Sequence, residues 1–217
     1  MSTNRESAIE RYRRMAPFYD RGRATYDGIR RRTVDLLQLR PGEIVIDVGC
    51  GTGLSFPLLQ EGVGPEGRLI GIDQSPEMLA RAQRKVDKNG WPNVTLIESP
   101  VEDAEIPVQA DAALFALSHD IIRNQEALEN VVRRLKPGAR VAVVGTMWAP
   151  WWALPIRIYQ WYTNRGGMTT YEGLGRPWSR LQHLVPNLRV VGRVLLGWRG
   201  RYYLACGAVS GTSPMSS

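Results

Sequence analysis

A short apolar run followed at once by closely spaced glycines constrains the fold of this chain more than any other feature. Residues 43–48 read EIVIDV, a β-branched run typical of a buried strand. Gly49, Gly51 and Gly53 follow directly, and a helical stretch begins at about Leu54. This order of strand, tight glycine turn and helix opens a parallel α/β sheet.

Strand-like and helical runs then alternate along the chain, which predicts a parallel sheet. Lys136-Pro137-Gly138 is expected to separate the last of these helices from the fifth strand. The final two runs are separated only by a Gly-Trp-Arg-Gly turn, so they should pair as an antiparallel hairpin at one sheet edge. Strands after the first are expected at residues 68–72, 94–98, 110–117, 140–145, 188–196 and 201–209, and helices over residues 75–89 and 124–135.

The predicted fold is a single doubly wound, Rossmann-like α/β domain. It has a mostly parallel seven-stranded sheet, an antiparallel C-terminal hairpin and helices on both faces. A length of 217 residues fits one domain better than two, and we expect it to span residues 1–210 before a flexible polar tail at 211–217. Residues 1–40, with a helix over 26–39, and an aromatic-rich insertion at 146–186 are expected to fold over the ligand cleft.

The net charge of +7 is concentrated at the two ends of the sequence. Residues 1–40 hold ten arginines against five acids, and residues 147–217 hold eight arginines against Glu172 alone. Such ends suit the phosphates of nucleic acid, an anionic membrane surface or an acidic substrate. Simple solvation of the fold explains them equally well.

The cysteines and the hydropathy suggest where the protein works. Cys50 and Cys206 are too few for a disulfide framework or a metal cluster, so we expect no metal and a reduced, cytoplasmic setting. The N-terminus carries arginines where a signal peptide needs an apolar core, and no uncharged run reaches the roughly 18 residues of a membrane span.

Two acidic residues stand where a ligand of such a sheet would bind, outside the carboxyl ends of the strands. Asp47 comes just before the glycine turn and is able to accept hydrogen bonds from an ammonium group. Asp73 ends the next strand and is positioned to accept both hydroxyls of a ribose. A dinucleotide fingerprint requires glycine or alanine at position 54, so Leu54 argues against NAD and a dehydrogenase.

Successive motifs resemble those of the class I S-adenosylmethionine-dependent methyltransferases over roughly residues 40–146. They are VIDVGCGTG, GIDQSPEML, a short acidic loop, DAALFALSHD and LKPGARV. The resemblance implies S-adenosylmethionine as cofactor and S-adenosylhomocysteine as product. It implies that the amino-acid end of the cofactor is held by Asp47, Gly49, Gly51 and Gly53, the ribose by Asp73, and the ribose and adenine surroundings by Gln74 and Met78.

Further cofactor contacts follow from the same resemblance. Relatives often carry Gly-Asp-Ala after the third strand, where this chain has Ser99-Pro100-Val101-Glu102, so the Val101 amide or Glu102 would substitute for the acidic contact near adenine. Residues 12–20 resemble a segment of the quinone-biosynthesis and phosphatidylethanolamine methyltransferase branch, which would place Tyr19 over the amino-acid end. Cys50 and Leu117 complete the predicted contacts. Met78 is equally well explained as a packing residue, and Cys50 better as a small buried residue than as a nucleophile.

Candidate catalytic residues follow the fourth strand at its carboxyl end. His119 is suited to take a proton from a hydroxyl or to position an amine, and Asp120 to orient His119 or to bind a cationic acceptor. The alternative is that His119 packs against or caps the next helix, and that Asp120 is its N-cap. Direct displacement from a sulfonium needs a base only for some acceptors, because alignment and exclusion of water do most of the work.

The candidate substrate contacts are Trp148, Trp152 and Trp161, which lie among further tyrosines and arginines of the insertion. Aromatic rings with arginines suit a planar or greasy acceptor, a lipid headgroup or an interfacial helix, and an aromatic core beneath a lid explains them equally well. The favoured hypothesis is N- or O-methylation of an amphipathic or aromatic small molecule or lipid headgroup, with peripheral binding to the inner face of a membrane.

Two alternatives to that hypothesis stay open. An RNA methyltransferase is permitted by the charge, but no appended RNA-binding module is recognisable, so nucleic acid is a poor candidate partner. A non-catalytic S-adenosylmethionine-binding module is disfavoured because the glycine turn and both acids are intact.

Overall fold

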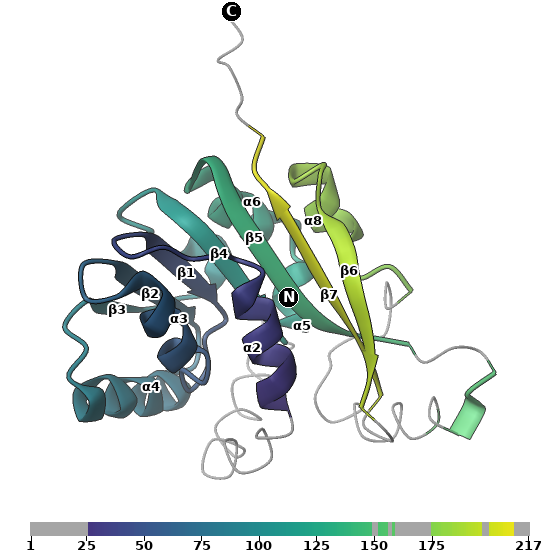
Figure 1. The fold of residues 1–217 in the computed structure, drawn as a ribbon, viewed down its shortest axis with the longest axis horizontal. Coiled ribbons are helices and arrows are strands. Elements are labelled where there is room, and N and C mark those ends of the chain that lie inside the picture. Colours follow the sequence, from purple (N-terminus) through teal and green to yellow (C-terminus); the bar gives the residue numbers. More distant parts are fainter. Residues whose placement is uncertain (1–25, 149–151, 156–157, 159–174, 197–199, 211–217) are drawn as a thin grey trace, which may run out of the picture.

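A seven-stranded sheet forms the centre of the computed structural model, which describes residues 26–148, 152–155, 158, 175–196 and 200–210 (Figure 1). The strand order is β3-β2-β1-β4-β5-β7-β6. Strands β1 to β5 pair in parallel, and β7 is antiparallel to both β5 and β6. The predicted sheet with a hairpin at one edge is confirmed. The strands are β1 Ile44–Val48, β2 Arg68–Asp73, β3 Val94–Glu98, β4 Ala110–Ala116, β5 Leu135–Met147, β6 Arg189–Leu195 and β7 Arg201–Ala208.

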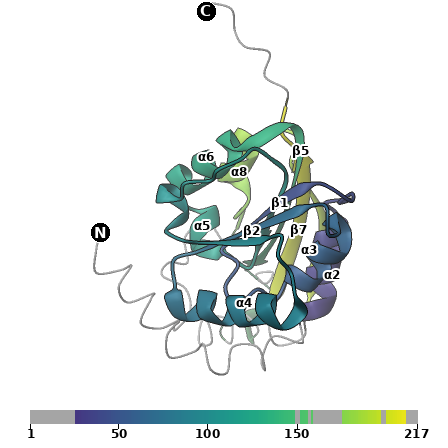
Figure 2. The same cartoon turned by 90° about the vertical axis from the view of Figure 1, so that its left-hand side faces the viewer.

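Helices cover both faces of the sheet, as predicted (Figures 1 and 2). On one face, buried side chains of α2, α3 and α4 share an apolar cluster with β1 and β2. On the other, α5, α6 and α8 and the short 3-10 helix η3 pack against the sheet in a second cluster. The helices are α2 Asp27–Asp35, α3 Phe56–Val63, α4 Pro76–Asn89, η3 Val101–Asp103, α5 His119–Ile122, α6 Gln125–Arg133 and α8 Ser179–Leu184.

Local sequence signals set the ends of the long helix α4. Ser75 is its N-cap, and its hydroxyl accepts a hydrogen bond from the Met78 amide at 3.4 Å. Pro76 occupies the first helical position, where its missing N–H costs nothing. Gly90 ends the helix in a left-handed conformation. The helix therefore starts three residues after Asp73, the last residue of β2.

The start of the fifth strand differs from the sequence prediction. Lys136-Pro137-Gly138 was expected to lie before the strand, yet β5 already begins at Leu135. Its pairing with β4 shifts register between Ala110 and Ala112, which is the irregularity that accommodates a proline in a strand. The Gly138 amide donates to the Val209 carbonyl at 2.9 Å, so backbone pairing continues through this irregular start.

The helix before β1 also ends earlier than the periodicity predicts. It was expected over residues 26–39, but α2 stops at Asp35. Gln38 has a positive φ of 47°, which is incompatible with a continued helix. Leu37 remains fully buried beyond the helix end, so the apolar face was predicted correctly although the boundary was not.

The strand order places the ligand crevice between β1 and β4. These strands are hydrogen-bonded neighbours, although β2 and β3 separate them in the sequence. The chain therefore leaves β1 in one direction across the sheet and returns on its other side at β4. Ligands of open α/β sheets bind outside the carboxyl ends of the strands at such a point.

Asn93 ties the loop before β3 to the end of α3, and we expect its loss to destabilise the fold. Its amide nitrogen donates to the Gly64 and Gly67 carbonyls at 3.0 and 2.9 Å, and its oxygen accepts from Gln60 at 3.0 Å. Asn93→Ala should lower the free energy of unfolding by about 2–3 kcal/mol, because buried polar partners lose their hydrogen bonds. Urea denaturation measures this, with the exposed Asn89→Ala as control. Equal stability of the two variants would contradict the prediction.

Candidate functional site

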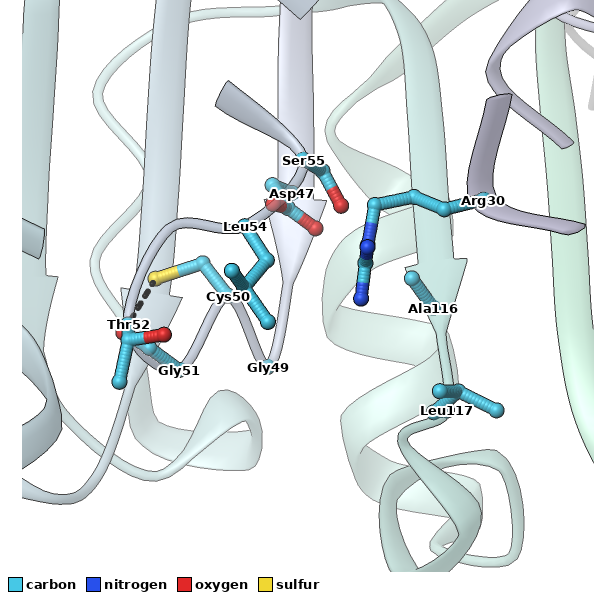
Figure 3. A pocket seen from close by; sticks show the side chains of 10 residues that line it. All are labelled: Arg30, Asp47, Gly49, Cys50, Gly51, Thr52, Leu54, Ser55, Ala116 and Leu117. Carbon is cyan, nitrogen blue, oxygen red and sulfur yellow. Dashed lines mark hydrogen bonds between the residues drawn. The ribbon is translucent and has the colours of Figure 1, made fainter. Parts of the chain in front are cut away.

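A pocket opens at the carboxyl ends of β1 and β4, with about 370 Å³ of empty space that includes part of the open solvent. Helix α2 supplies one wall, the end of β1 and the glycine turn a second, and the end of β4 a third (Figure 3). Its lining residues are Arg30, Asp47, Gly49, Cys50, Gly51, Thr52, Leu54, Ser55, Ala116 and Leu117. Five of these residues, Asp47, Gly49, Cys50, Gly51 and Leu117, were predicted to contact a cofactor.

Asp47 is a buried carboxylate that receives no hydrogen bond from the described residues. Its side chain is 1% exposed, and among the described residues neither carboxylate oxygen has a hydrogen-bond partner. Burial raises the pKa of Asp47 to about 7, the positive charge of Arg30 acts against this rise, and the negative charge of Asp73 adds to it. A buried carboxylate without partners is costly, so its place at the pocket wall indicates a site for a hydrogen-bond donor or cation.

Arg30 brings a positive charge into the same pocket from α2. It is 6% exposed, and its guanidinium donates to the carboxylate of Asp27 one helical turn earlier. Figure 3 shows Arg30 and Asp47 pointing toward the same space from opposite sides. The pocket wall therefore carries one negative and one positive group.

The glycine turn presents backbone to the pocket. Gly49 and Gly51 have φ values of 71° and 57°, which a side chain would strain. A Cβ atom on Gly49 would lie 2.6 Å from the Ile121 side chain, whereas one on Gly51 would meet nothing within 4 Å. Gly49 is therefore required for packing of the turn against α5, while the space beside Gly51 is open to a ligand.

Asp73 binds both the glycine turn and the start of α4. Its two carboxylate oxygens accept from the Gly51 and Ser75 amides, each at 2.9 Å. Burial raises the pKa of Asp73, and the hydrogen bonds from the amides of Ser75, Gly51 and Gln74 act against the rise. A carboxylate offers about four acceptor positions, so Asp73 retains capacity to accept from a ligand.

The predicted catalytic pair lies just beyond the end of β4. Leu117 has a φ of 59°, which is rare for a non-glycine residue and strains the backbone beside the pocket. His119 and Asp120 are half-buried and form the first turn of α5. Ser118, not Asp120, is the N-cap residue of that helix, so the alternative role of Asp120 as N-cap is not realised. The Ser118 hydroxyl is buried without a hydrogen-bond partner in the described part of the chain.

The other predicted site residues are not among the described residues that line this pocket. Met78 is 1% exposed and Val101 3%, so both side chains are packed inside. Gln74 and Glu102 are half-buried beside the ends of β2 and β3. Trp148 is half-buried after β5, and Trp152 is 70% exposed. Gly53 packs against the Phe56 ring, and Tyr19 and Trp161 fall outside the described residues.

Sequence reasoning missed several pocket residues, and Arg30 is the most informative of them. It lies seven residues before Leu37 and four before Val34, on the apolar stripe of α2, whereas Arg31 and Arg32 are exposed. That helical spacing was the available signal for a buried arginine. The other unpredicted lining residues are Thr52, Leu54, Ser55 and Ala116.

Alanine substitutions at the two glycines should separate packing from binding. Gly49→Ala should lower the free energy of unfolding by about 2–4 kcal/mol, from positive-φ strain and the clash with Ile121. Gly51→Ala adds only the strain, about 1–2 kcal/mol, but its methyl group would occupy the open space and weaken cofactor binding about 10- to 200-fold. Urea denaturation and calorimetric titration measure the two effects. If Gly51→Ala binds the cofactor as tightly as the wild type does, the cofactor does not occupy the open space beside Gly51.

The motif sequence and the fold both match known methyltransferases. A family model described as a methyltransferase domain matches residues 45–138. The arsenite methyltransferase of Halobacterium salinarum is 33% identical over 109 residues, which are 48% of this chain and 27% of that protein. The demethylmenaquinone methyltransferase of Listeria welshimeri is 29% identical over 153 residues, 66% of this chain and 64% of that protein. The chain thus spans less than two thirds of either relative.

A solved structure supports the same conclusion. The S-adenosylmethionine-dependent methyltransferase from Aquifex aeolicus superimposes with a TM-score of 0.55 at 25% identity, covering 83% of this chain and 89% of that one. The resemblance seen in the motifs therefore extends to the seven-stranded sheet. Residues 45–138 form a methyltransferase domain, set in the fold of the class I S-adenosylmethionine-dependent methyltransferases.

Proposed function

We propose that this chain is an S-adenosylmethionine-dependent methyltransferase that acts on an amphipathic or aromatic small molecule or lipid headgroup. The buried carboxylate of Asp47, which has no hydrogen-bond partner among the described residues, carries the cofactor part of the proposal. It lies in the pocket wall beside the glycine turn, where the ammonium group of an amino acid would satisfy it.

The described residues fit this cofactor. Asp47 would hold the ammonium group, the open space beside Gly51 admits a ligand close to the backbone, and Asp73 would accept from the ribose hydroxyls. Leu54 lines the pocket at the position where a dinucleotide fingerprint requires glycine or alanine. The cofactor supplies an electrophilic methyl group on a sulfonium. The chain's task is then to position the acceptor and to exclude water.

Exposed apolar side chains after β5 favour a hydrophobic methyl acceptor. Trp152, Leu154 and Ile158 are 70%, 59% and 58% exposed, and they follow β5 in the sequence. Arsenite, the substrate in the name of one relative, is soft and prefers thiolate ligands. This chain has two cysteines, and burial raises the pKa of the Cys50 thiol well above its usual value. We therefore favour an oxygen or nitrogen acceptor.

Calorimetry followed by a product assay tests the proposed activity. Micromolar binding of S-adenosylmethionine and S-adenosylhomocysteine, about −8 kcal/mol, without binding of NAD, is the expected result. Formation of S-adenosylhomocysteine is then measured with a naphthoquinol, phosphatidylethanolamine vesicles, short RNA and arsenite as acceptors. Absence of binding would overturn the cofactor assignment. Binding with no turnover on any acceptor would favour the non-catalytic module.

We propose His119 as general base or positioning group at the end of β4, with Asp120 beside it. Both begin α5, next to the turn at Leu117 that lines the pocket. His119→Gln should lower kcat by about 10²–10⁴-fold if a hydroxyl acceptor needs a base, and should remove the inflection that such a base produces in the pH dependence of kcat. An unchanged pH profile in His119→Gln would contradict a base and leave only positioning.

We also propose peripheral contact with an anionic membrane. No helix among the described residues is long and apolar enough to cross a bilayer. On the edge strand β6, Val191 and Leu195 are each 52% exposed and alternate with the exposed Arg189 and Arg193. Apolar groups among cations suit anionic headgroups. Flotation with anionic and neutral vesicles tests this, and equal failure to bind both would remove the proposal.

A further inference from the structure

We propose that Arg30 is the carboxylate-binding residue of the cofactor pocket. Together with Asp47 it would select a ligand that carries a whole zwitterionic amino-acid group. The inference rests on the proposed function, because it concerns the same pocket. It adds a residue from outside the matched domain, since Arg30 lies on α2 and the match begins at residue 45.

Arg30 is the buried member of three consecutive arginines on α2. Arg31 and Arg32 are exposed, whereas Arg30 is 6% exposed and shares the buried side of α2 with Thr33 and Val34. Burying a guanidinium costs free energy unless a partner compensates it. An arginine that served only solubility would occupy one of the exposed positions of the helix.

The Arg30 guanidinium pairs with Asp27 but not with Asp47. Its Nη1 atom donates to Asp27, whose side chain is 64% exposed, so that pair is partly in solvent. A guanidinium has five N–H donors, which is more than the single carboxylate of Asp27 can occupy. Arg30 lowers the pKa of Asp47 through its charge, yet among the described residues neither Asp47 oxygen accepts a hydrogen bond from it. The two charged groups therefore line one pocket and interact electrostatically, but no hydrogen bond joins them.

The charges along the described pocket wall come from two side chains of opposite sign. Among its described lining residues Arg30 is the only cation and Asp47 the only anion. They approach the same space from α2 and from the end of β1 (Figure 3). A ligand with adjacent ammonium and carboxylate groups compensates both, and a bidentate arginine–carboxylate pair suits that geometry. A ligand with the ammonium group alone would leave the guanidinium without a carboxylate partner inside the pocket, and Asp27 would be its only described partner.

The test compares S-adenosylmethionine with its decarboxylated analogue, which retains the ammonium group, the ribose and the adenine. The wild-type protein should bind S-adenosylmethionine about 10- to 150-fold more tightly, as expected for hydrogen bonds between charged groups. Arg30→Met should abolish this preference. Arg31→Met, on the adjacent exposed position that pairs with Glu61 at 3.7 Å, should retain it. Calorimetric titration of the three proteins with both ligands gives all six affinities without any turnover.

The ratio of the two affinities isolates the carboxylate from indirect effects. Loss of Arg30 also removes a charge that lowers the pKa of Asp47, but this change weakens ammonium binding for both ligands alike. An equal preference in wild type and Arg30→Met would overturn the inference, and so would a wild-type protein that binds both ligands equally. The second result does not require any variant to fold. Failure of the wild type to bind either ligand would instead overturn the proposed function.

Discussion

Asp47→Asn is expected to stabilise the ligand-free protein while weakening S-adenosylmethionine binding about 10- to 150-fold, the effect of losing a hydrogen bond between charged groups. Burial raises the pKa of Asp47 from 3.8 to about 7. At 1.36 kcal/mol per pKa unit, the folded protein gives up about 4 kcal/mol at pH 8 to keep this carboxylate ionised. A neutral amide of the same shape avoids most of that cost, so the variant should gain about 1–3 kcal/mol in unfolding free energy.

The matched control for Asp47 is Asp111, a carboxylate with the opposite environment. Asp111 accepts from the Lys136 ammonium at 2.7 Å and from the Ile44 amide at 2.9 Å. Although burial acts to raise it, these hydrogen bonds and the charge of Lys136 hold the pKa of Asp111 below its usual value. Asp111→Asn should therefore lower stability and leave cofactor affinity unchanged. Loss of stability in Asp47→Asn, or unchanged affinity, would contradict the assignment of Asp47.

Titration of Asp47 should make the free energy of unfolding and the cofactor affinity change in opposite directions with pH. Below pH 4 Asp47 is protonated in both folded and unfolded chains, and between about pH 4 and 7 the unfolded chain ionises first. Ionisation of Asp47 therefore lowers the free energy of unfolding progressively over that window. Above about pH 7 this loss is complete and does not change further. Cofactor affinity should instead rise through about pH 7, because the ionised form binds the ammonium group, and fall as the α-amino group deprotonates above about pH 8. Calorimetry from pH 5.5 to 9 on wild type and Asp47→Asn separates this effect from other titrating groups.

The parts of the fold and site that could be predicted are those encoded locally. The apolar β-branched run before Gly49 predicts a buried strand without reference to the rest of the chain. Ser75-Pro76 predicts a helix start, because the serine hydroxyl caps the first turn and proline suits the first helical position. The positions of Asp47 and Asp73 could then be predicted as well, because the carboxyl ends of neighbouring parallel strands lie at one edge of the sheet.

What could not be predicted depends on contacts between distant segments. Arg30 meets the β1 turn only because α2 packs against β4 and β5, and no local pattern encodes that approach. The early start of β5 also depends on distant segments, because Leu135 pairs with Ala110 of β4 and the Gly138 amide donates to the Val209 carbonyl. The roles of Tyr19 and Trp161 stay predictions.

Asp73→Ala should cause the largest loss of cofactor affinity, about 10²- to 10⁴-fold, because two hydrogen bonds from ribose hydroxyls to a charged acceptor are removed together. The substitution also releases the Gly51 and Ser75 amides, each of which donates to this carboxylate at 2.9 Å. Part of the loss would therefore come from a loosened glycine turn. Amide hydrogen exchange at Gly51 and Ser75 in the ligand-free variant measures how far the glycine turn has loosened, independently of ligand binding.

Two further variants define the role of Asp73. Asp73→Asn keeps one acceptor oxygen, so it should retain part of the affinity that Asp73→Ala loses. Asp103→Ala, which removes an exposed acid from the nearby 3-10 helix, should bind as the wild type does. Calorimetric titration with S-adenosylhomocysteine gives each value. If Asp73→Ala binds as tightly as Asp103→Ala, the carboxylate only holds the turn, and the ribose must be recognised by backbone groups instead.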